Sequence, residues 1–455
     1  MQHLREKEFS RLDANGQVYL DYTGAGLYPE SLIREYNDWL ANAICGNPHS
    51  LSPSSTVSTE HVETARAAVL QFFNTSPDRY SVIFTPNASG GLKLIGESYP
   101  FNAESRFVLT ADNHNSVNGI REFAKSKAAS VSYVPLNSEM RVENLTLPEV
   151  NRSRHNLFAY PVQSNFTGVK HPLDWIRGAH EVGYDVLLDA AAYVPTNHLD
   201  LSKSDPDFVA ISFYKMFGFP TGVGAIIGKV EALRKLHRPW FAGGTVRFVS
   251  TQNGVHILKT SSEAFEDGTV NFLSIPAITM GLNFLSQVGI KNINENVTKL
   301  TELMLEKLHS LRHSNGIPLV KIYGPTQVQE RGATVAMNLL SPEKRELDYR
   351  LVEERAMKEN ISIRTGCFCN PGAAEAAFQY PAVTAYQCFE KLSPGEFSLQ
   401  QFSSCMNDLP VGAVRASLGI ASNEADVERF VQLLREFTDL RVESKPRLMP
   451  DVVGT

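Results

Sequence analysis

Lys215 and Asp189 are the two residues whose types and spacing point most clearly to chemistry. Asp189 ends the apolar run Val186-Leu187-Leu188-Asp189, and Lys215 follows the next apolar run, in Ser212-Phe213-Tyr214-Lys215. An amine in apolar surroundings can form a Schiff base with an aldehyde, and a carboxylate can keep a pyridine nitrogen protonated. These are the two functions that pyridoxal 5'-phosphate requires of a protein. The pair therefore predicts a pyridoxal phosphate site, with a solvated surface lysine as the alternative.

A candidate thiol nucleophile lies later in the chain, in Arg364-Thr365-Gly366-Cys367-Phe368-Cys369-Asn370-Pro371-Gly372. The glycines and the proline predict a loop, and the guanidinium of Arg364 would favour a nearby thiolate. Cys367 and Cys369 could instead be half of a metal site or inert buried thiols. The sequence has no second cysteine or histidine pair at zinc-like spacing, so we expect no metal.

Two further candidates follow predicted strands. The loop Thr85-Pro86-Asn87-Ala88-Ser89-Gly90-Gly91 precedes a predicted helix. Its N–H groups and the Ser89 hydroxyl could hold a phosphate, and a capped turn without a ligand is the alternative. The ring of His114 could stack on a pyridine or move protons, and the alternative is a structural or exposed histidine.

Asn165 and Arg415 are candidates for binding a substrate. Asn165 could hydrogen-bond a cofactor oxygen or a carboxylate, or it could cap a turn. Arg415 lies inside a predicted strand. If its side chain points outward, it is a solvated charge. If it points inward, it needs an anion, and the carboxylate of an amino acid suits the two parallel N–H donors of arginine.

These residues need a framework, and the apolar pattern predicts one. Apolar runs alternate with amphipathic segments from about residue 80 to 228, which is typical of a mostly parallel sheet between helices. The expected strands are Tyr80–Thr85, Arg106–Thr110, Ser130–Val134, Asn156–Pro161, Asp185–Asp189, Phe208–Ser212 and Gly224–Gly228. Asp189 and Lys215 should then share the carboxyl edge of the sheet, where open α/β sheets bind ligands.

The remainder predicts a smaller α+β domain. Helices are expected at Ile275–His313 (two, separated near Gly289), Leu347–Lys358 and Glu424–Phe437, and strands at Val320–Tyr323, Ala333–Leu339, Ile361–Arg364 and Val411–Leu418. We therefore predict a large domain at residues 60–290, a small domain at residues 1–59 and 291–445, and a tail at 446–455. Residues before about 60 would return to the small domain as an arm, and Gln379–Asp408 would be an irregular surface insertion.

Composition excludes several classes of partner. The 455 residues carry a net charge of −6, which offers no electrostatic surface for nucleic acid. No apolar run is long enough to span a bilayer, and the N-terminus has no signal-peptide pattern. Five cysteines, an odd number, do not resemble a disulfide framework. We expect a cytoplasmic protein that binds neither nucleic acid nor membranes.

The ordered motifs resemble those of the fold-type I, class V aminotransferase superfamily, in its cysteine desulfurase branch. Within that branch they are most similar to the N-terminal, desulfurase-like domain of eukaryotic molybdenum cofactor sulfurases. The resemblance runs from about residue 18 to 437 and rests on Asp21-Tyr22-Thr23-Gly24-Ala25-Gly26, Gly46-Asn47-Pro48-His49-Ser50, Asn113-His114-Asn115-Ser116-Val117, Phe158-Ala159-Tyr160-Pro161, Gln163-Ser164-Asn165-Phe166, Leu188-Asp189-Ala190-Ala191-Ala192, Ser212-Phe213-Tyr214-Lys215 and Arg364-Thr365-Gly366-Cys367-Phe368-Cys369-Asn370-Pro371-Gly372-Ala373.

The resemblance implies pyridoxal phosphate as the cofactor, a homodimer, and a role for each matching residue. These implied roles are Lys215 as the Schiff-base lysine, Asp189 as the partner of the pyridine nitrogen, His114 as the stacking ring, Ala88, Ser89 and Ser212 as cofactor contacts, Asn165 as a cofactor or substrate contact, Gly268 and Thr269 as phosphate contacts across the dimer, Cys369 as the persulfide-forming nucleophile, and Arg415 and Arg364 as substrate-binding residues.

The implied reaction converts L-cysteine to L-alanine and transfers sulfur, as a Cys369 persulfide, to an unidentified acceptor. The alternatives are a C–S lyase or another amino-acid-transforming enzyme, which would need Lys215 but not Cys369, and a non-catalytic binding protein of the same fold. Three departures are expected to matter: no C-terminal molybdenum-cofactor-binding domain, Ala374 where the sulfurases usually carry a cysteine, and Ala192 where bacterial-type desulfurases use a glutamine. The sulfurase branch shares the last change.

Overall fold

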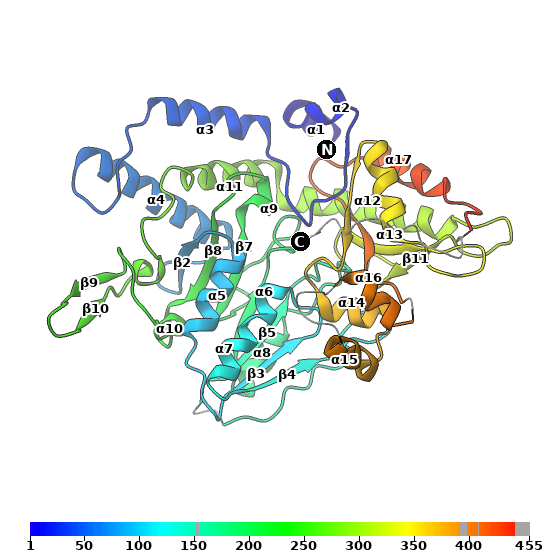
Figure 1. The fold of residues 1–455 in the computed structure, drawn as a ribbon. Helices are drawn as coiled ribbons and strands as arrows, with labels where there is room; N and C mark the ends of the chain where they lie inside the picture. Colours follow the sequence, from blue (N-terminus) through cyan, green and yellow to red (C-terminus); the bar gives the residue numbers. More distant parts are fainter. Residues whose placement is uncertain (152–153, 392–397, 408, 442–455) are drawn as a thin grey trace.

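A seven-stranded sheet forms the centre of the computed structural model, which describes residues 1–151, 154–391, 398–407 and 409–441 (Figure 1). Its strands lie in the order β2 (Tyr80–Thr85), β8 (Gly224–Lys229), β7 (Phe208–Ser212), β6 (Asp185–Asp189), β5 (Leu157–Pro161), β3 (Arg106–Thr110) and β4 (Ser130–Val134). Strand β8 runs antiparallel to both of its neighbours, whereas β7, β6, β5, β3 and β4 pair in parallel. The predicted mostly parallel sheet is confirmed.

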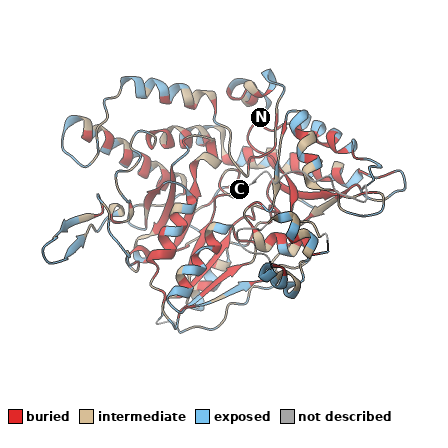
Figure 2. Cartoon of the chain, in the orientation of Figure 1, coloured by how far each residue is buried: buried red, intermediate tan, exposed pale blue. Residues whose placement is uncertain are grey.

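Both faces of the sheet are covered, which explains why the inner strands β5, β6, β7 and β8 are almost entirely buried. One face packs against α5 (Ala88–Ser98) and α7 (Ile120–Ser126) through one cluster of buried side chains. The other face packs against α4 (Pro53–Phe72), α8 (Trp175–Glu181) and α11 (Pro276–Val288) through a second cluster. Figure 2 shows the strands as the most buried layer, with exposed residues on the outer sides of the helices.

A four-stranded antiparallel sheet forms the core of the smaller part of the chain. Its order is β11 (Val320–Tyr323), β12 (Thr334–Leu339), β15 (Ala413–Ser417) and β14 (Arg364–Gly366), and α12 (Ile290–Ser310), α13 (Tyr349–Lys358) and α17 (Glu424–Arg435) accompany it. The predicted helix break at Gly289 is confirmed. The division into domains near residues 59 and 290 stays a prediction, and the predicted tail at 446–455 lies outside the described residues.

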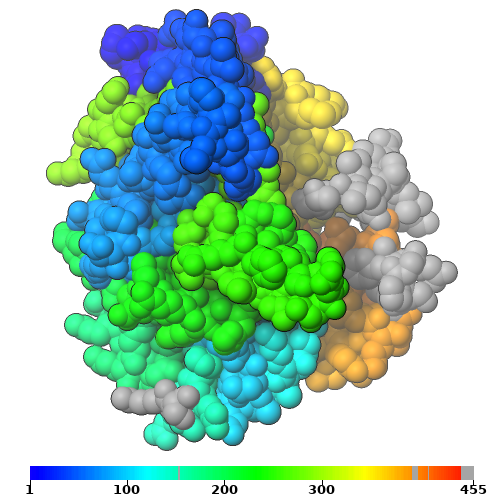
Figure 3. Space-filling model, turned by 90° about the vertical axis from the view of Figure 1, so that its left-hand side faces the viewer, coloured from blue at the N-terminus to red at the C-terminus, as the bar shows by residue number. Residues whose placement is uncertain are grey.

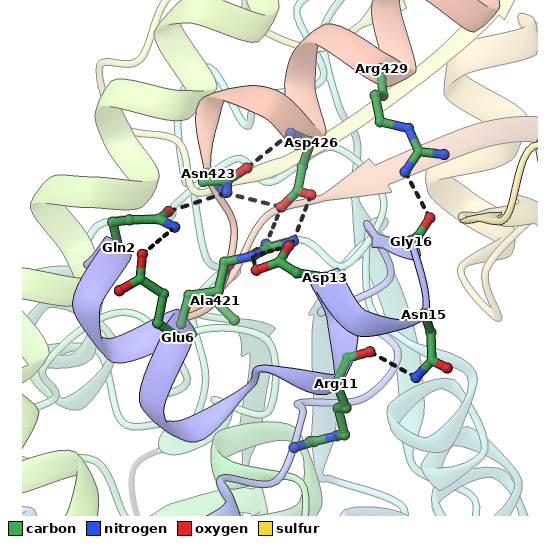
Figure 4. Close-up of polar contacts among 11 residues, drawn as sticks. Gln2, Glu6, Arg11, Asp13, Asn15, Gly16, Ala421, Asn423, Asp426 and Arg429 are labelled. Carbon is green, nitrogen blue, oxygen red and sulfur yellow. Dashed lines mark hydrogen bonds and ion pairs between the residues drawn. The ribbon is translucent and has the colours of Figure 1, made fainter.

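The first residues of the chain contact elements assigned to the predicted small domain. Helix α1 (Gln2–Glu8) carries Arg5, which forms ion pairs with Asp13 (2.8 Å) and with Asp426 at the start of α17 (2.6 Å). In Figure 4 the side chains of Asp13 and Asp426 come together from the two segments, because both accept hydrogen bonds from Arg5. Gln2 lies against Asn423. Strand β1 (Val18–Tyr19) then pairs in parallel with β13 (Ile361–Ser362). The following α3 (Glu30–Asn42) and α4 instead pack on α11 of the large domain.

Two sequence-based expectations about the cysteine-bearing insertion were wrong. The described part of Gln379–Asp408, which follows α14 (Pro371–Phe378), is mainly helical rather than irregular, with α15 (Ala382–Lys391) and α16 (Leu399–Cys405). Cys388 and Cys405 form a disulfide with an S–S distance of 2.03 Å, whereas the odd cysteine count predicts no disulfide framework. Pairing depends on how the two helices pack, with Cys388 buried beside Phe402 and Met406, and the cysteine count carries no information about that packing.

Two absences hold for the described ranges. No group of three or more histidine, cysteine or acidic side chains there is arranged to hold a metal ion. No helix in those ranges is both long enough and apolar enough to cross a membrane.

Candidate active site

A cavity of about 370 Å³ lies at the carboxyl ends of β5, β6 and β7. Its lining includes most of the predicted site: Ala88, Ser89, His114, Asn165, Asp189, Ser212 and Lys215. A larger cavity of about 690 Å³ lies elsewhere, between residues 137–147, residues 169–182 and Glu330, and none of the predicted site residues lines it. We therefore place the site at the smaller cavity, where the candidate reactive groups converge.

Lys215 is presented to the cavity by a short helix. Helix α9 (Phe213–Phe217) begins directly after β7 and buries Phe213, Met216 and Phe217, which leaves Lys215 on the cavity side. The helix ends at Gly218, whose φ of 77° and close approach to the backbone of Tyr28 leave no space for a side chain.

The surroundings of Lys215 favour its neutral amine. Burial lowers the pKa of Lys215 from its usual value, Asp189 opposes that effect most strongly, and Arg415 adds to the lowering. Cys369 has a smaller, raising influence on the same pKa. A neutral amine is the form that can act as nucleophile or base.

Asp189 is a nearly buried carboxylate at the end of β6. One oxygen accepts a hydrogen bond from the N–H of Ala191 at 3.0 Å, and its side chain forms no ion pair with another described residue. A buried carboxylate needs a partner for its charge, and the side chain lines the cavity. A protonated pyridine nitrogen would fill that need, so Asp189 fits the ring end of pyridoxal phosphate.

His114 has a structural role as the cap of a helix and also lines the cavity. Its Nδ1 accepts a hydrogen bond from the N–H of Ser116 at 3.1 Å and so begins α6 (Asn115–Asn118). Its ring also lines the cavity. Burial lowers the pKa of His114, Asp189 opposes this, and Lys215 and Arg415 reinforce it. A neutral, held ring at this place suits stacking on a planar group.

The start of α5 has the features of a phosphate site. The side chain of Asn87 accepts a hydrogen bond from the N–H of Gly90 at 2.9 Å, and the Ser212 hydroxyl accepts from the N–H of Ala88 at 3.1 Å. The hydroxyls of Ser89 and Ser116 are 2.5 Å apart at the cavity. The helix N-terminus and these hydroxyls would stabilise a phosphate, so the cavity fits pyridoxal phosphate at both ends.

Gly268 and Thr269 do not line the cavity within one chain. Thr269 is exposed, and its hydroxyl accepts a hydrogen bond from the side chain of Asn47 at 3.2 Å. Their predicted contact with a phosphate across a dimer interface stays a prediction.

The loop of Cys369 is fixed by its backbone at the edge of the cavity. Phe368 and Cys369 have positive φ values of 57° and 51°, which turn the chain sharply between β14 and α14. The carbonyl oxygen of Cys369 accepts a hydrogen bond from the N–H of Asn115 at 2.7 Å. The Asn165 side chain, which lines the cavity, donates to the carbonyl of Phe368 at 2.7 Å. Cys369 is half-buried, whereas Cys367 is exposed.

Arg415 points inward, and the anion that it meets in the structure is Asp21. Its Nη2 donates to Asp21 at 3.0 Å and its Nη1 to the carbonyl of Asn165 at 2.9 Å. Arg364 donates to the other Asp21 oxygen at 2.7 Å and 3.1 Å. The charge expected to favour the Cys369 thiolate is therefore engaged by Asp21.

Three residues that shape this site, Asp21, Asn370 and Gln163, could not be predicted from the sequence. Asp21 lies in a motif that was noted without a chemical function. Asn370 is fully buried and hydrogen-bonds Asp112 and Asn165. Gln163 lines the cavity and donates to the carbonyl of Ala192 at 3.0 Å. Asp21 and Gln163 each lie in a motif on which the family resemblance rests, which was the signal available, but their partners are distant in sequence.

Comparison with known protein families and sequences gives one consistent result. The aminotransferase class-V family model matches residues 18–430. Molybdenum cofactor sulfurase of Danio rerio is 37% identical over 95% of this chain and 54% of its own length. The Arabidopsis thaliana and human sulfurases are each 35% identical, over 95% and 98% of this chain and 58% and 52% of their own lengths. The chain thus spans about half the length of the curated relatives it matches.

Solved structures show the same fold at low sequence identity. A cysteine desulfurase from Thermococcus onnurineus superposes with a TM-score of 0.77 at 22% identity, covering 96% of this chain and 97% of that one. A cysteine desulfurase from Escherichia coli gives a TM-score of 0.73 at 19% identity, covering 95% and 97%. The α/β fold with its small domain is that of these proteins.

Proposed function

Because the chain belongs to the class V aminotransferase family, we propose that it is a pyridoxal-phosphate-dependent, cysteine desulfurase-like enzyme. It would convert L-cysteine to L-alanine and carry the sulfur as a persulfide on Cys369 to an acceptor. One observation carries the proposal: a single cavity brings Lys215 and Asp189 together with Asn165, whose side chain holds the Cys369 loop.

The cavity residues divide into those that hold the cofactor and those that move protons. When bound, pyridoxal phosphate supplies an aldehyde that captures amines and a protonated ring that withdraws electrons from the substrate Cα. Asp189 would keep the ring nitrogen protonated, His114 would lie against the ring, and Ser89 would hold the phosphate. Lys215, with its lowered pKa, would take the Cα proton at Nζ and return it to the product.

Cys369 would perform the sulfur transfer itself. Its thiolate attacks the sulfur atom of the substrate, so an S–S bond forms while the C–S bond breaks. The electron pair of the C–S bond stays on the substrate Cβ, which takes up a proton, and the carbon skeleton leaves as alanine. A nucleophile on the acceptor then takes the outer sulfur, and the Cys369 thiolate is the leaving group.

We extend the proposal to a homodimer. Large apolar side chains are exposed on the loop between α3 and α4 (Ile44 at 80%, Leu51 at 99%) and on the hairpin of β9 (Val246–Val249) and β10 (His256–Leu258), with Phe248 at 56% and Ile257 at 53%. Trp240, in the segment that leads into β9, is 53% exposed. Figure 3 shows the hairpin in green beside the blue segment of α3 and α4 on one face. An apolar face of this kind is typical of an interface, and Gly268 and Thr269 follow the hairpin in the chain.

The acceptor and the location belong to the same proposal. The curated relatives are molybdenum cofactor sulfurases, so a molybdenum cofactor is the first acceptor to test. We propose a cytoplasmic location, no contact with nucleic acid or membranes, and L-cysteine as the sulfur donor.

Product analysis with L-cysteine tests the proposed function. Wild-type enzyme is expected to form alanine, and Cys369→Ala is expected to lose sulfur transfer while keeping the cofactor absorbance. Lys215→Ala should lose both. Pyruvate and sulfide that persist in Cys369→Ala would show a C–S lyase instead.

A further inference from the structure

Asp21 lies between the two arginines expected at the amino-acid site, and we propose that it determines specificity there. By engaging Arg364, Asp21 makes the site select amino acids with an uncharged side chain over those with an acidic one. The proposal rests on the proposed function for the identity of the site, but it concerns only the charge at that site.

The strand register brings Arg364 and Arg415 together. They are directly opposite each other in the antiparallel pair of β14 and β15. Like charges at opposed positions repel one another, and each needs a counterion. Asp21 supplies it to both, with one oxygen 3.0 Å from Arg415 and the other 2.7 Å from Arg364.

Asp21 is fixed in this position by its own turn. The N–H of Thr23 donates to the Ser417 hydroxyl at 2.9 Å, and Asp21 itself bridges to Ser417 in β15. A Cβ at residue 24 would lie 2.6 Å from the nearer Asp21 carboxylate oxygen, so Gly24 leaves the space that the carboxylate occupies. With only 10% of its side chain exposed, Asp21 is a built part of the site.

The two arginines are not equivalent. Arg415 is 4% exposed, with its guanidinium 4.7 Å from the ring of Phe368, whereas Arg364 is 47% exposed. Both Nε and Nη2 of Arg364 donate to the same Asp21 oxygen. These two donors form the edge of the guanidinium that can bind a carboxylate in a bidentate way. Arg415 is therefore a fixed part of the interior, and Arg364 is the cation that a second acid could recruit.

Arg364 begins β14, which leads directly into the loop of Cys369, and its neighbour Arg415 donates to the carbonyl of Asn165 at the cavity. This arrangement places Arg364 near the position that the substrate side chain must occupy. Burial alone would lower the pKa of Arg364, but Asp21 and, more weakly, Tyr19 and Cys369 raise it. The substrate sulfur has to meet Cys369, so the end of the substrate side chain comes close to this guanidinium. With Asp21 in place, the three side chains carry a net charge of +1, which one α-carboxylate balances. An acidic substrate side chain would gain no free cation there, because Arg364 is already paired with Asp21.

Equilibrium binding of two amino acids tests this inference, with L-cysteate as the acidic probe and L-alanine as the neutral one. Cofactor absorbance of the holoenzyme reports both. In Asp21→Asn the affinity for cysteate relative to alanine should rise at least about tenfold over wild type. Asp13→Asn, which removes an arginine partner elsewhere in the N-terminal arm, should leave the ratio unchanged. An unchanged ratio in Asp21→Asn would overturn the proposal.

Two further variants keep the test decisive if Asp21→Asn folds poorly. In the wild-type background, Arg364→Gln should change the ratio by less than about threefold, because Asp21 already engages this arginine. A loss of cysteate affinity of about tenfold or more would show that Arg364 is free, against the proposal. In the double variant with Asp21→Asn, Arg364→Gln should abolish the gain. Neither probe carries a sulfur that the proposed reaction transfers, so failure to make alanine from L-cysteine is a separate result.

Discussion

The side-chain amide of Asn370 donates a 2.7 Å hydrogen bond to the backbone carbonyl of Asp112, two residues before His114. The same amide donates to the side chain of Asn165 at 2.9 Å. Asn370 follows Cys369 on a loop that begins at a strand of the small sheet, whereas Asp112 and Asn165 follow strands of the large sheet. The cysteine is thereby held at a defined place relative to the cavity, which is what a nucleophile attacking a bound substrate requires.

Replacing Asn370 should slow sulfur transfer more than it destabilises the fold. Asn370→Ala removes two buried hydrogen bonds and the cap of α14, at a cost of about 1 to 3 kcal/mol. Persulfide formation should slow by about tenfold to a hundredfold, because a small displacement of the Cys369 thiol from the substrate sulfur lowers the reaction rate by that much. Asn423→Ala, which removes the cap of α17 and a 3.4 Å hydrogen bond to Gln2, is the control. Equal rates in the two variants would contradict a positioning role for Asn370.

His114 should make the cofactor-free protein sensitive to acid. Its pKa in the folded chain is below the usual 6.5, chiefly because of burial. The unfolded chain then binds more protons than the folded one below about pH 6.5, so the stability is fully present above that value and falls as pH drops through the lowered pKa.

Urea unfolding of cofactor-free protein between pH 5 and pH 8 measures this effect. The free energy of unfolding of His114→Gln should depend less on pH in the acid range than that of wild type. His198→Gln, at an exposed histidine, should follow the wild-type curve. Parallel curves for His114→Gln and wild type would show that His114 keeps an ordinary pKa in the folded chain.

Thiol counting should reveal the disulfide between Cys388 and Cys405. Denatured but unreduced protein should present three reactive thiols, from Cys45, Cys367 and Cys369, and all five cysteines should react after reduction. The bond closes a segment with a sequence separation of 17, so Cys405→Ser should lower the free energy of unfolding by up to about 3 kcal/mol. Five reactive thiols before reduction would rule out the bond.

A charge on the β9–β10 hairpin should dissociate the proposed dimer. Ile257→Asp places an unpaired carboxylate in the apolar face, where burial of an unpaired charge is costly. Light scattering at micromolar concentration should give a dimer mass for wild type and a monomer mass for this variant. Val383→Asp, at an exposed valine on α15, is the control. A monomeric wild type, or a dimer that tolerates Ile257→Asp, would refute the interface.

Local patterns were enough to predict the framework of the site. The strands β2, β3, β4, β6 and β7 have the predicted boundaries. Strands β2, β3, β6 and β7 are short, mainly apolar runs, whereas the edge strand β4 alternates serine with apolar residues. The parallel pairing of β5, β6 and β7 then brings their carboxyl ends together. The convergence of Asp189 and Lys215 on one cavity follows from that geometry alone.

Contacts between distant segments could not be read in the same way. Asp21 meets Arg415 only because the N-terminal turn bridges to β15, and Cys388 meets Cys405 only because α15 and α16 fold back on one another. The antiparallel direction of β8 likewise depends on how the chain returns to the sheet. Periodicity reports burial of one element at a time, so it does not identify partners.

The location of the transferred sulfur tests the account most directly. Holoenzyme is mixed with L-cysteine, alkylated without reductant, digested and analysed by mass spectrometry, with Cys369→Ala and Cys367→Ala as paired variants. The account predicts one extra sulfur atom on Cys369, formed in step with alanine, retained in Cys367→Ala and absent from Cys369→Ala. Alanine or pyruvate produced with no sulfur on Cys369, or persulfide on Cys367 alone, would contradict it.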